Sequence, residues 1–504
     1  MTSHSFNQSF LSICTISQDS TGSLRKGSFE TNFHIEAKQI VEEFNPGERA
    51  RILRKLDWHL LPFVSLLYML SFLDRTNVGK LGRVPHPVFS SPSLGNAKVA
   101  GMSQDLHLTG FRYNIAAAVF FILYSFAEVP SNIALKLFRP SRWIPIIMVA
   151  WGLVMTLMCL VDSFRSLVVA RLFLGLTEAG LFPGVTYYIS LWYPRSEQSK
   201  RIAIFFSAAT IAGAFGGLLA YGIERMEGIG GLHGWQWIFC LEGIATLLVA
   251  CFSFFCMHDP ERAYVINMLK QDADCLATHY DLRFILQAMK DYKTYIQVFT
   301  YMGLLVPVYA IALFTPTIIN ELGYSATHAQ LLSVPPFIAG CITTILVGVY
   351  SDKYNLRGPF IIGGALVSIV GYIMLYCDRQ AGLSYAGTCL AAIGVYPTIA
   401  VDLAWAGSNA GGDFKRGVVI AMVIGIGNLG GICSSFIYID PPHFHVGHGT
   451  IIGFLFLSIS LSLFSMWNYD RLNKKKQAQC LAEGITDSRR DDFKDMGDAS
   501  PLFR

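Results

Sequence analysis

Runs of about 20 mostly apolar residues recur along this chain, and a run of that length is what an α-helix needs to cross the hydrocarbon core of a bilayer. Twelve such runs predict membrane-spanning helices at 58–78, 111–135, 143–161, 166–191, 202–223, 236–256, 296–319, 329–350, 359–377, 383–405, 416–438 and 449–468. The pattern predicts an all-α membrane protein of twelve transmembrane helices in two six-helix halves, an arrangement typical of transporters that bind substrate at the bilayer midplane.

The polar stretches between the runs set the expected domain boundaries. These are an N-terminal tail at 1–55, a first half at 56–256, a linker at 257–292, a second half at 293–470 and a C-terminal tail at 471–504.

The composition supports a membrane protein and argues against several other classes. Hydrophobic residues make up 53% of the chain and charged residues only 15%, against about 25% charged residues in typical soluble domains. The net charge is +4, and no basic stretch is interleaved with aromatic residues, so a nucleic-acid partner is not expected. The eleven cysteines are scattered without metal-ligand or disulfide spacing. We therefore expect no cofactor and no metal.

The basic residues of the short loops predict the orientation, because cytoplasmic loops are enriched in Lys and Arg. Four loops on one side hold ten such residues: Lys136, Arg139, Arg142, Arg195, Lys200, Arg201, Lys353, Arg357, Lys415 and Arg416. The opposite loops between spans 3–4, 5–6, 7–8 and 9–10 hold three: Arg165, Arg225 and Arg379. Both termini and the 257–292 linker are therefore predicted to be cytoplasmic.

Four ionisable residues lie inside apolar runs, namely Asp74, Arg75, Arg171 and Glu178. A charge at the bilayer centre costs at least about 2.5–3.5 kcal/mol on insertion scales, so such residues are usually functional or paired. Arg171 and Glu178 are seven residues apart and share one helix face, about 10.5 Å apart along the axis. Asp74 and Arg75 are adjacent, so their directions differ by about 100°, and we expect both charged faces to reach one aqueous cavity.

These residue types suit the binding of an organic anion together with a proton. The planar guanidinium of Arg75 or Arg171 can pair bidentately with a carboxylate. Proton coupling needs a carboxyl group placed where desolvation favours its protonation. Glu178 is our first candidate for the proton carrier and Asp74 the second. The alternative is a buried ion-pair network that only orders spans 1 and 4.

Three other acidic residues are weaker candidates. Glu128 lies two residues before Pro130 in span 2. A role in gating or in anchoring the loop is as consistent with this position as a role in proton coupling. Glu242 and Asp402 lie near span ends, where a solvated or capping role is expected.

Several motifs resemble those of the major facilitator superfamily. They are Gly348-Val-Tyr-Ser-Asp352-Lys353-Tyr-Asn-Leu-Arg357 after span 8, similar to the family's gating loop motif, and Arg171-Leu-Phe-Leu-Gly175 in span 4. Leu73-Asp74-Arg75-Thr76-Asn77-Val78-Gly79 and Gly175-Leu-Thr-Glu178-Ala-Gly180 resemble the anion:cation symporter branch. Leu191-Trp192-Tyr193-Pro194 resembles the fungal allantoate and nicotinate permeases within it.

This resemblance implies a monomeric, multi-pass permease of the plasma membrane that takes up a small organic anion with a proton, such as nicotinate or allantoate. It also implies substrate contacts from a span 2 tyrosine and a span 11 asparagine, which Tyr124 and Asn428 match. Tyr124 could equally be an ordinary packing aromatic.

The segment 80–95 departs from the family pattern. It separates Gly79 from Asn96-Ala97, which follow the glycine directly in the family, and it places Lys80 and Arg83 on the predicted external side. The segment is either sequence retained at a splice boundary or a genuine external loop.

Three other functions remain open at this point. A proton antiporter that exports xenobiotics would share the fold, although two intramembrane arginines favour anion uptake. A non-transporting nutrient sensor usually carries longer cytoplasmic extensions than the tails of about 55 and 35 residues here. An inactive splice form becomes plausible if the 80–95 segment disrupts span 1.

Overall fold

The computed structural model describes residues 46–77, 102–108, 112–138, 140–224, 226, 228–256, 282–323, 326–377, 380–438, 444–485, 493 and 496–503. The chain divides into two compact units, Met1–Arg54 and Lys55–Arg504. Of the first unit, the described residues are 46–54, which begin a helix. The atypical segment 80–95, most of the N-terminal tail and residues 257–281 of the linker lie outside the described residues.

The regular structure in the described ranges is helical, as the sequence predicts. The long helices are α3 (Pro46–Asn77), α6 (Arg112–Phe138), α7 (Pro140–Leu157), α8 (Phe164–Glu178), α9 (Leu181–Trp192), α10 (Gln198–Glu224), α11 (Gly234–Cys256), α14 (Tyr292–Glu321), α15 (Ala326–Tyr354), α16 (Gly358–Cys377), α17 (Ala381–Asn409), α18 (Asp413–Asn428), α19 (Gly430–Ile437) and α20 (His445–Glu483). Shorter elements are α5 (Met102–Asp105), α13 (Leu282–Lys290) and the 3₁₀ turns η1 (Met158–Leu160), η2 (Arg195–Glu197) and η3 (Ile229–Gly231).

Each of the twelve predicted spans is helical over almost its whole length, although α3 begins well before the first span and α20 ends well after the last. In the described part of the chain, eleven helical stretches are long and apolar enough to cross a membrane. α10, which covers the fifth predicted span, is helical but is not among those eleven. The prediction of an all-α membrane protein is therefore confirmed.

Two predicted spans differ from the structure because each is broken into two helices. Span 4 ends as α8 at Glu178 and restarts as α9 at Leu181. Pro183 has no amide hydrogen to donate to the carbonyl of residue 179, but such a proline is tolerated in the first turn of a new helix. Span 11 breaks at Leu429, immediately before Gly430 and Gly431.

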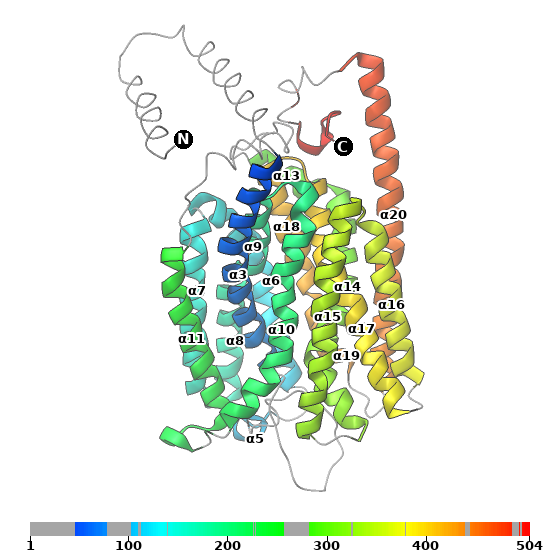
Figure 1. Cartoon of the computed structure of the whole chain (residues 1–504). Coiled ribbons are helices and arrows are strands. Elements are labelled where there is room, and N and C mark those ends of the chain that lie inside the picture. Colours follow the sequence, from blue (N-terminus) through cyan, green and yellow to red (C-terminus); the bar gives the residue numbers. More distant parts are fainter. Residues whose placement is uncertain are drawn as a thin grey trace, which may run out of the picture. The chain divides into compact units, whose positions relative to one another are not determined.

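Two polar segments are more regular than their composition suggests. The predicted linker ends in the short helix α13. α20 continues to Glu483, so the first part of the predicted C-terminal tail extends the last span as a helix. In Figure 1 this helix projects past the ends of its neighbours.

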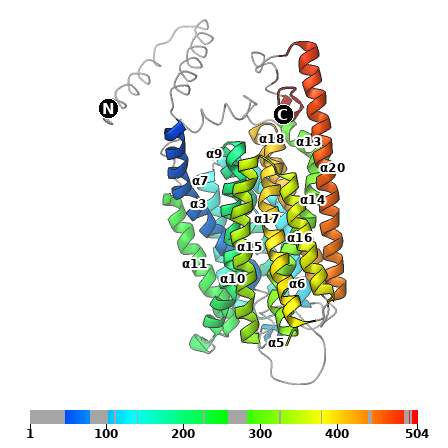
Figure 2. The same ribbon diagram turned by 45° about the vertical axis from the view of Figure 1, so that its right-hand side comes forward.

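The helices of the two halves pack side by side. α7 packs against α11 and α6 against α8 in the first half, whereas α16 packs against α17 and α14 against α20 in the second. Figures 1 and 2 show α7 and α11 at one side and α16 and α20 at the other. The halves meet where α10 packs against α15 and α6 against α18. Tyr124, Glu128 and Asn428, described below, belong to the helices of this second contact.

Close approach of helices depends on glycine at particular positions. A Cβ at residue 364 on α16 would lie 2.6 Å from Cγ2 of Thr398 and 2.7 Å from the carbonyl oxygen of Gly394 on α17. The adjacent Gly363 is exposed, and a Cβ there would meet no atom within 4 Å. α16 therefore carries two adjacent glycines, of which Gly364 faces closely packed atoms and Gly363 does not.

We expect Gly364→Ala to destabilise the protein by about 1–3 kcal/mol, because the new methyl group overlaps backbone that must then shift. Gly363→Ala should be neutral or stabilising by up to about 1 kcal/mol, the difference in helix propensity. Thermal unfolding of the purified proteins in detergent compares the two. Equal melting temperatures would contradict the close packing of α16 and α17.

Candidate functional site

The centre of the site is an ion pair between the two predicted functional elements, spans 1 and 4. Arg75 lies in the last turn of α3, and its Nε donates to Oε1 of Glu178, the last residue of α8, at 2.6 Å. Ser71, one turn before Arg75, donates to the same carboxylate oxygen. Arg75 is 7% exposed and Glu178 is fully buried. The proton-carrier candidate and a substrate-binding candidate are thus in direct contact.

The remaining nitrogens of Arg75 reach two tyrosines from different halves. Nη2 donates to the hydroxyl of Tyr124 on α6 at 2.6 Å, and Nη1 donates to that of Tyr309 on α14 at 3.3 Å. The guanidinium also lies over the Tyr124 ring, with Cζ 4.4 Å from its centroid. Arg75 is therefore bonded by α8, α6 and α14 together.

A chain of hydrogen bonds continues from Tyr309 back to the first half. The Tyr309 hydroxyl donates to Oδ1 of Asn428 at 2.7 Å, and Nδ2 of Asn428 donates to Oε1 of Glu128 at 3.1 Å. Glu128 lies one turn after Tyr124 on α6 and is fully buried. These two bonds determine which way the Asn428 amide points, since its nitrogen faces a carboxyl group and its oxygen a hydroxyl.

Arg171 lies beside this chain of contacts. It is on α8, two turns before Glu178, and is 2% exposed. Its Cζ is 5.8 Å from the ring centroid of Phe120, and Cζ of Arg75 is 5.7 Å from the same centroid. The two predicted substrate-binding arginines therefore approach one aromatic ring.

Asp74 faces a different part of the first half, and the structure does not bring it into this cluster. Its Oδ2 accepts from Nε1 of Trp151 on α7 at 2.8 Å, and its carboxyl group also interacts with that of Glu242 on α11. The turn of about 100° between adjacent helical residues carries Asp74 away from Arg75. The structure thus brings Arg75, but not Asp74, into hydrogen-bond contact with Glu178 of span 4.

Of the two roles expected for Glu242 and Asp402, the solvated one is wrong, because both side chains are buried. Glu242 is 5% exposed and Asp402 is fully buried. Asp402 on α17 accepts from Nε2 of Gln297 on α14 at 2.5 Å. Their positions near span ends on the sequence do not bring them to the surface, because neighbouring helices cover them.

The gating loop motif, which begins in the last turns of α15, forms contacts between the halves. Asp352 accepts from the backbone N–H groups of Ser199 at 3.1 Å and Lys200 at 2.7 Å, at the start of α10. A carboxylate is favourable there because the first N–H groups of a helix have no partners within the helix. A Cβ at Gly348 would lie 2.4 Å from Cβ of Ala203, so this glycine allows α15 to approach α10 closely.

The other two motif residues behave differently from each other. Arg357 is 8% exposed and donates to the carbonyl oxygen of Arg195 at 2.5 Å. It also donates to the carbonyl oxygen of Ala404 and to the Ser408 hydroxyl. Lys353 is exposed, with Nζ 5.8 Å from the ring centroid of Tyr354. Arg357 therefore links the halves, whereas the contact of Lys353 with Tyr354 stays within α15.

Sequence reasoning did not identify Tyr309 or Ser71, which contact the ion pair directly. Tyr309 is one of 22 tyrosines in the chain and has no charge to distinguish it inside an apolar run. Ser71 could have been found, because it lies four residues before Arg75 on the same helix face. The role of Trp151 as donor to Asp74 was likewise not visible in the sequence.

Comparison with known proteins agrees with this architecture. A model of the Major Facilitator Superfamily matches residues 64–435. The MFS-type transporter cnsO of Penicillium expansum is 33% identical over 519 residues, which cover 98% of this chain and 95% of that protein. The high-affinity nicotinic acid transporter of Saccharomyces cerevisiae is 30% identical over 454 residues, which cover 87% of this chain and 81% of that protein.

Solved structures share the fold at low sequence identity. The proton:xylose symporter XylE, bound to 6-bromo-6-deoxy-D-glucose, is 16% identical with a TM-score of 0.60, covering 81% of this chain and 95% of that one. An inward-facing bacterial homologue of the human lysosomal transporter Spinster is 15% identical with a TM-score of 0.56, covering 81% and 96%. At these identities the likeness concerns the fold alone.

We expect Glu178→Ala to lower the free energy of unfolding by about 3–5 kcal/mol, because it leaves the buried Arg75 without its counter-ion. The double variant Arg75→Met/Glu178→Leu removes both charges and should recover much of that loss. Chemical denaturation in detergent measures both. If the double variant were less stable than Glu178→Ala, Glu178 would not be the main electrostatic partner of Arg75.

Proposed function

This chain belongs to the Major Facilitator Superfamily, and on that basis we propose that it is a proton-coupled symporter that imports a small organic anion by alternating access. The observation that carries the proposal is the contact between Arg75 and Glu178, a buried cation and a buried acid at the boundary of the two halves. The cation suits the anionic substrate, and the acid suits the proton.

Arg75 is the proposed receptor for the substrate carboxylate. It is permanently charged, and its fork of N–H groups matches a carboxylate. Its present partners, Glu178 and the hydroxyls of Tyr124 and Tyr309, are groups that a substrate carboxylate can replace. Arg171, near the same Phe120 ring, supplies a second positive charge. The nicotinic acid transporter at 30% identity supports nicotinate or a similar acid as the substrate.

Competition for Arg75 provides a physical link between proton and substrate. Ionised Glu178 occupies Nε of Arg75, so a substrate carboxylate must share or displace that bond. When Glu178 takes up a proton, its attraction to the guanidinium weakens and Arg75 becomes available for the substrate. Proton and anion therefore bind together, and the pair enters without adding net charge to the site. Asp74, bonded to Trp151, is the second candidate for the proton.

The second half takes part through Tyr309 and Asn428. Both residues belong to the hydrogen-bond chain that joins Arg75 to Glu128 across the boundary. A substrate that takes the place of Tyr309 on Arg75 leaves its hydroxyl and the Asn428 amide free to contact the rest of the substrate. Substrate binding thereby changes hydrogen bonds in both halves, which alternating access requires. The gating loop residues Gly348, Asp352 and Arg357 are proposed to close one end of the pathway, with Lys353 at its surface.

The orientation is proposed from the loop charges. Ten Lys and Arg residues on one side against three on the other support cytoplasmic termini. Import of a nutrient acid from outside the cell further implies the plasma membrane.

Arg75→Lys should reduce uptake of radiolabelled nicotinate about 10- to 150-fold in kcat/KM, since losing a charged hydrogen bond costs about 1.5–3 kcal/mol. Lysine keeps the charge, but its single ammonium cannot reach Glu178, Tyr124 and Tyr309 at once. The control is Arg112→Lys, at an exposed arginine that begins α6. Uptake is measured in yeast lacking its own nicotinate permease. The comparison requires equal expression of the two variants and activity in the parent protein. Equal uptake by the two variants would then contradict the assignment of Arg75 to the substrate site.

Glu178→Gln should separate substrate binding from proton coupling. The amide resembles the protonated acid in shape and in neutrality, so substrate still binds, but no proton is released to the cytoplasm. We expect concentrative uptake to stop, while exchange of labelled for unlabelled substrate continues and loses its pH dependence. Glu483→Gln, at an exposed residue at the end of α20, is the control. A Glu178→Gln protein that still concentrates substrate with normal pH dependence would move the proton to another group, and Asp74→Asn would then be tested.

A further inference from the structure

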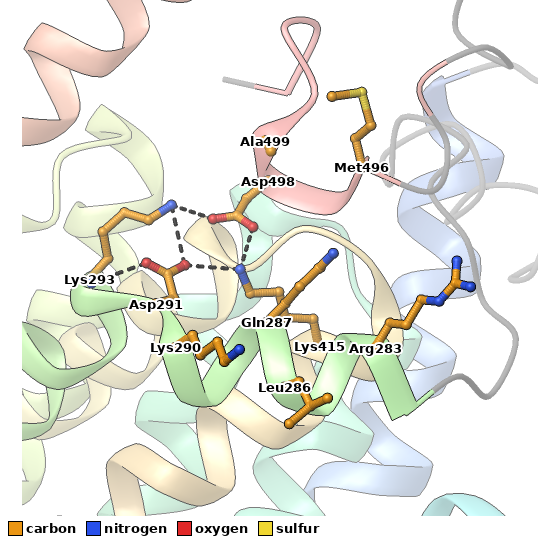
Figure 3. A pocket seen from close by; sticks show the side chains of 10 residues that line it. All are labelled: Arg283, Leu286, Gln287, Lys290, Asp291, Lys293, Lys415, Met496, Asp498 and Ala499. Atoms are coloured by element: carbon orange, nitrogen blue, oxygen red, sulfur yellow. Dashed lines mark hydrogen bonds and ion pairs between the residues drawn. The ribbon is translucent and has the colours of Figure 1, made fainter.

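The last described residues, 496–503, fold back against the end of the bundle that carries the gating loop motif. Figure 3 shows this segment over α13 and the start of α18. It forms compact turns, with the N–H of Ser500 donating to the carbonyl oxygen of Gly497 and that of Phe503 to Ser500, each at 3.2 Å. Asp498, Ser500 and Phe503 are 8%, 3% and 4% exposed. A polar tail that is buried to this extent occupies a specific binding site.

The acidic residue of this segment completes a network of four charges. Asp498 accepts from the ammonium groups of Lys293 on α14 and Lys415 on α18. Asp291, beside α14, contacts the same two lysines at 3.4 and 2.9 Å. Figure 3 shows the two carboxylates and the two ammonium groups alternating. Without Asp498, the buried Lys415 and the partly buried Lys293 would share a single carboxylate.

The backbone of the segment is held as well as its side chain. Nζ of Lys476 on α20 donates to the carbonyl oxygens of Asp498 at 2.5 Å and Phe503 at 2.8 Å. A Cβ at Gly411, in the turn before α18, would lie 2.3 Å from the Asp498 nitrogen. The absence of a side chain at Gly411 is therefore what lets the segment approach this closely.

The final aromatic residue reaches the other half of the protein. The Phe503 ring lies under the guanidinium of Arg195, with Cζ 4.4 Å from the ring centroid. Arg195 belongs to η2, between α9 and α10 of the first half, and its carbonyl oxygen accepts from Arg357 of the second. The segment thus contacts both halves at the point where the gating loop motif also joins them.

We propose that residues 496–503 form an internal strap, that the cradle of Arg195, Lys293, Lys415 and Lys476 is a binding site for this acidic, aromatic peptide, and that the docked strap holds this end of the transporter closed. Alternating access requires the halves to separate at each end in turn. A segment bonded to α14, α18 and α20 and stacked on η2 must release at least one side before this end can open.

The charge of Asp498 defines what can release the strap. Burial by itself raises the pKa of Asp498, but the ammonium groups of Lys293 and Lys415 outweigh this effect and lower the pKa to about 2, from an ordinary value of 3.8. Because the docked value is depressed, the contribution of this carboxylate is complete above about pH 4 and is lost only as the pH falls towards 2. Physiological pH changes therefore leave the strap docked, and its release requires a competing charge or a change in the strap itself.

The docking is tested with a cysteine probe that replaces Ser500 by an isosteric residue. Ser500→Cys should react slowly with a maleimide in the purified full-length protein, followed by mass spectrometry of the labelled peptide. Adding Asp498→Lys should raise the rate at least tenfold. Combining it with Lys293→Asp, Lys415→Asp and Asp291→Lys, which inverts all four charges and keeps them alternating, should slow it again. Lys474→Glu is the control, because Lys474 forms an exposed pair with Asp470. Fast labelling without Asp498→Lys, or no rescue by the charge swap, would overturn the docking.

The link to opening is tested with a second probe between the halves. Ser199 is fully buried at the start of α10, where its backbone N–H meets Asp352. The labelling rate of Ser199→Cys should rise several-fold when Asp498→Lys releases the strap, and also when residues 496–504 are deleted. A released strap with an unchanged rate at residue 199 would overturn its role in closure. Neither probe uses a substrate, so the outcome is independent of whether this protein carries nicotinate or any other anion.

Discussion

The constraint on which this site depends is that a guanidinium in the interior of a membrane protein stays charged and must be bonded on every side. Arginine cannot escape this cost by losing its proton, because the guanidinium group stays protonated in proteins. Lipid offers no hydrogen-bond partners to replace those of water. Arg75 meets this constraint with Glu178 from α8, Tyr124 from α6 and Tyr309 from α14. Three helices are thereby held in a fixed relation to α3.

One of these partners lies in the second half, and this gives the ion pair more than a local role. Tyr309 donates a hydrogen bond to Asn428, and Asn428 donates one to Glu128 in the first half. A ligand that takes over any bond of Arg75 therefore changes the partners available to residues on both sides of the boundary. Under the proposed alternating-access mechanism, such shared bonds connect occupancy of the site to the arrangement of the halves.

The contacts at the gating-loop end of the bundle follow a different principle. Asp352 binds backbone N–H groups of α10, and Arg357 binds backbone carbonyl oxygens. These partners belong to helix ends and turns, so they are available in any sequence that keeps the helices in place. The strap at residues 496–503 relies instead on matched side-chain charges from Lys293 and Lys415. Contacts of this kind are specific to this chain and can be changed by single substitutions.

The sequence by itself determined the membrane class, the helices at the twelve predicted spans and the presence of charged residues inside spans 1 and 4. These features follow from local properties: the length of apolar runs, and the cost of placing a charge inside one. Only the tertiary structure decided which charges meet. Glu178 and Arg75 are 103 residues apart, and Tyr309 is 234 residues from Arg75. Their contacts depend on how each helix is rotated and packed, and a rotation of about 100° is enough to send Asp74 to Trp151 instead. The polar composition of the C-terminal tail likewise gave no sign that Asp498 is buried between two lysines, because that position depends on surfaces provided by α14, α18 and α20.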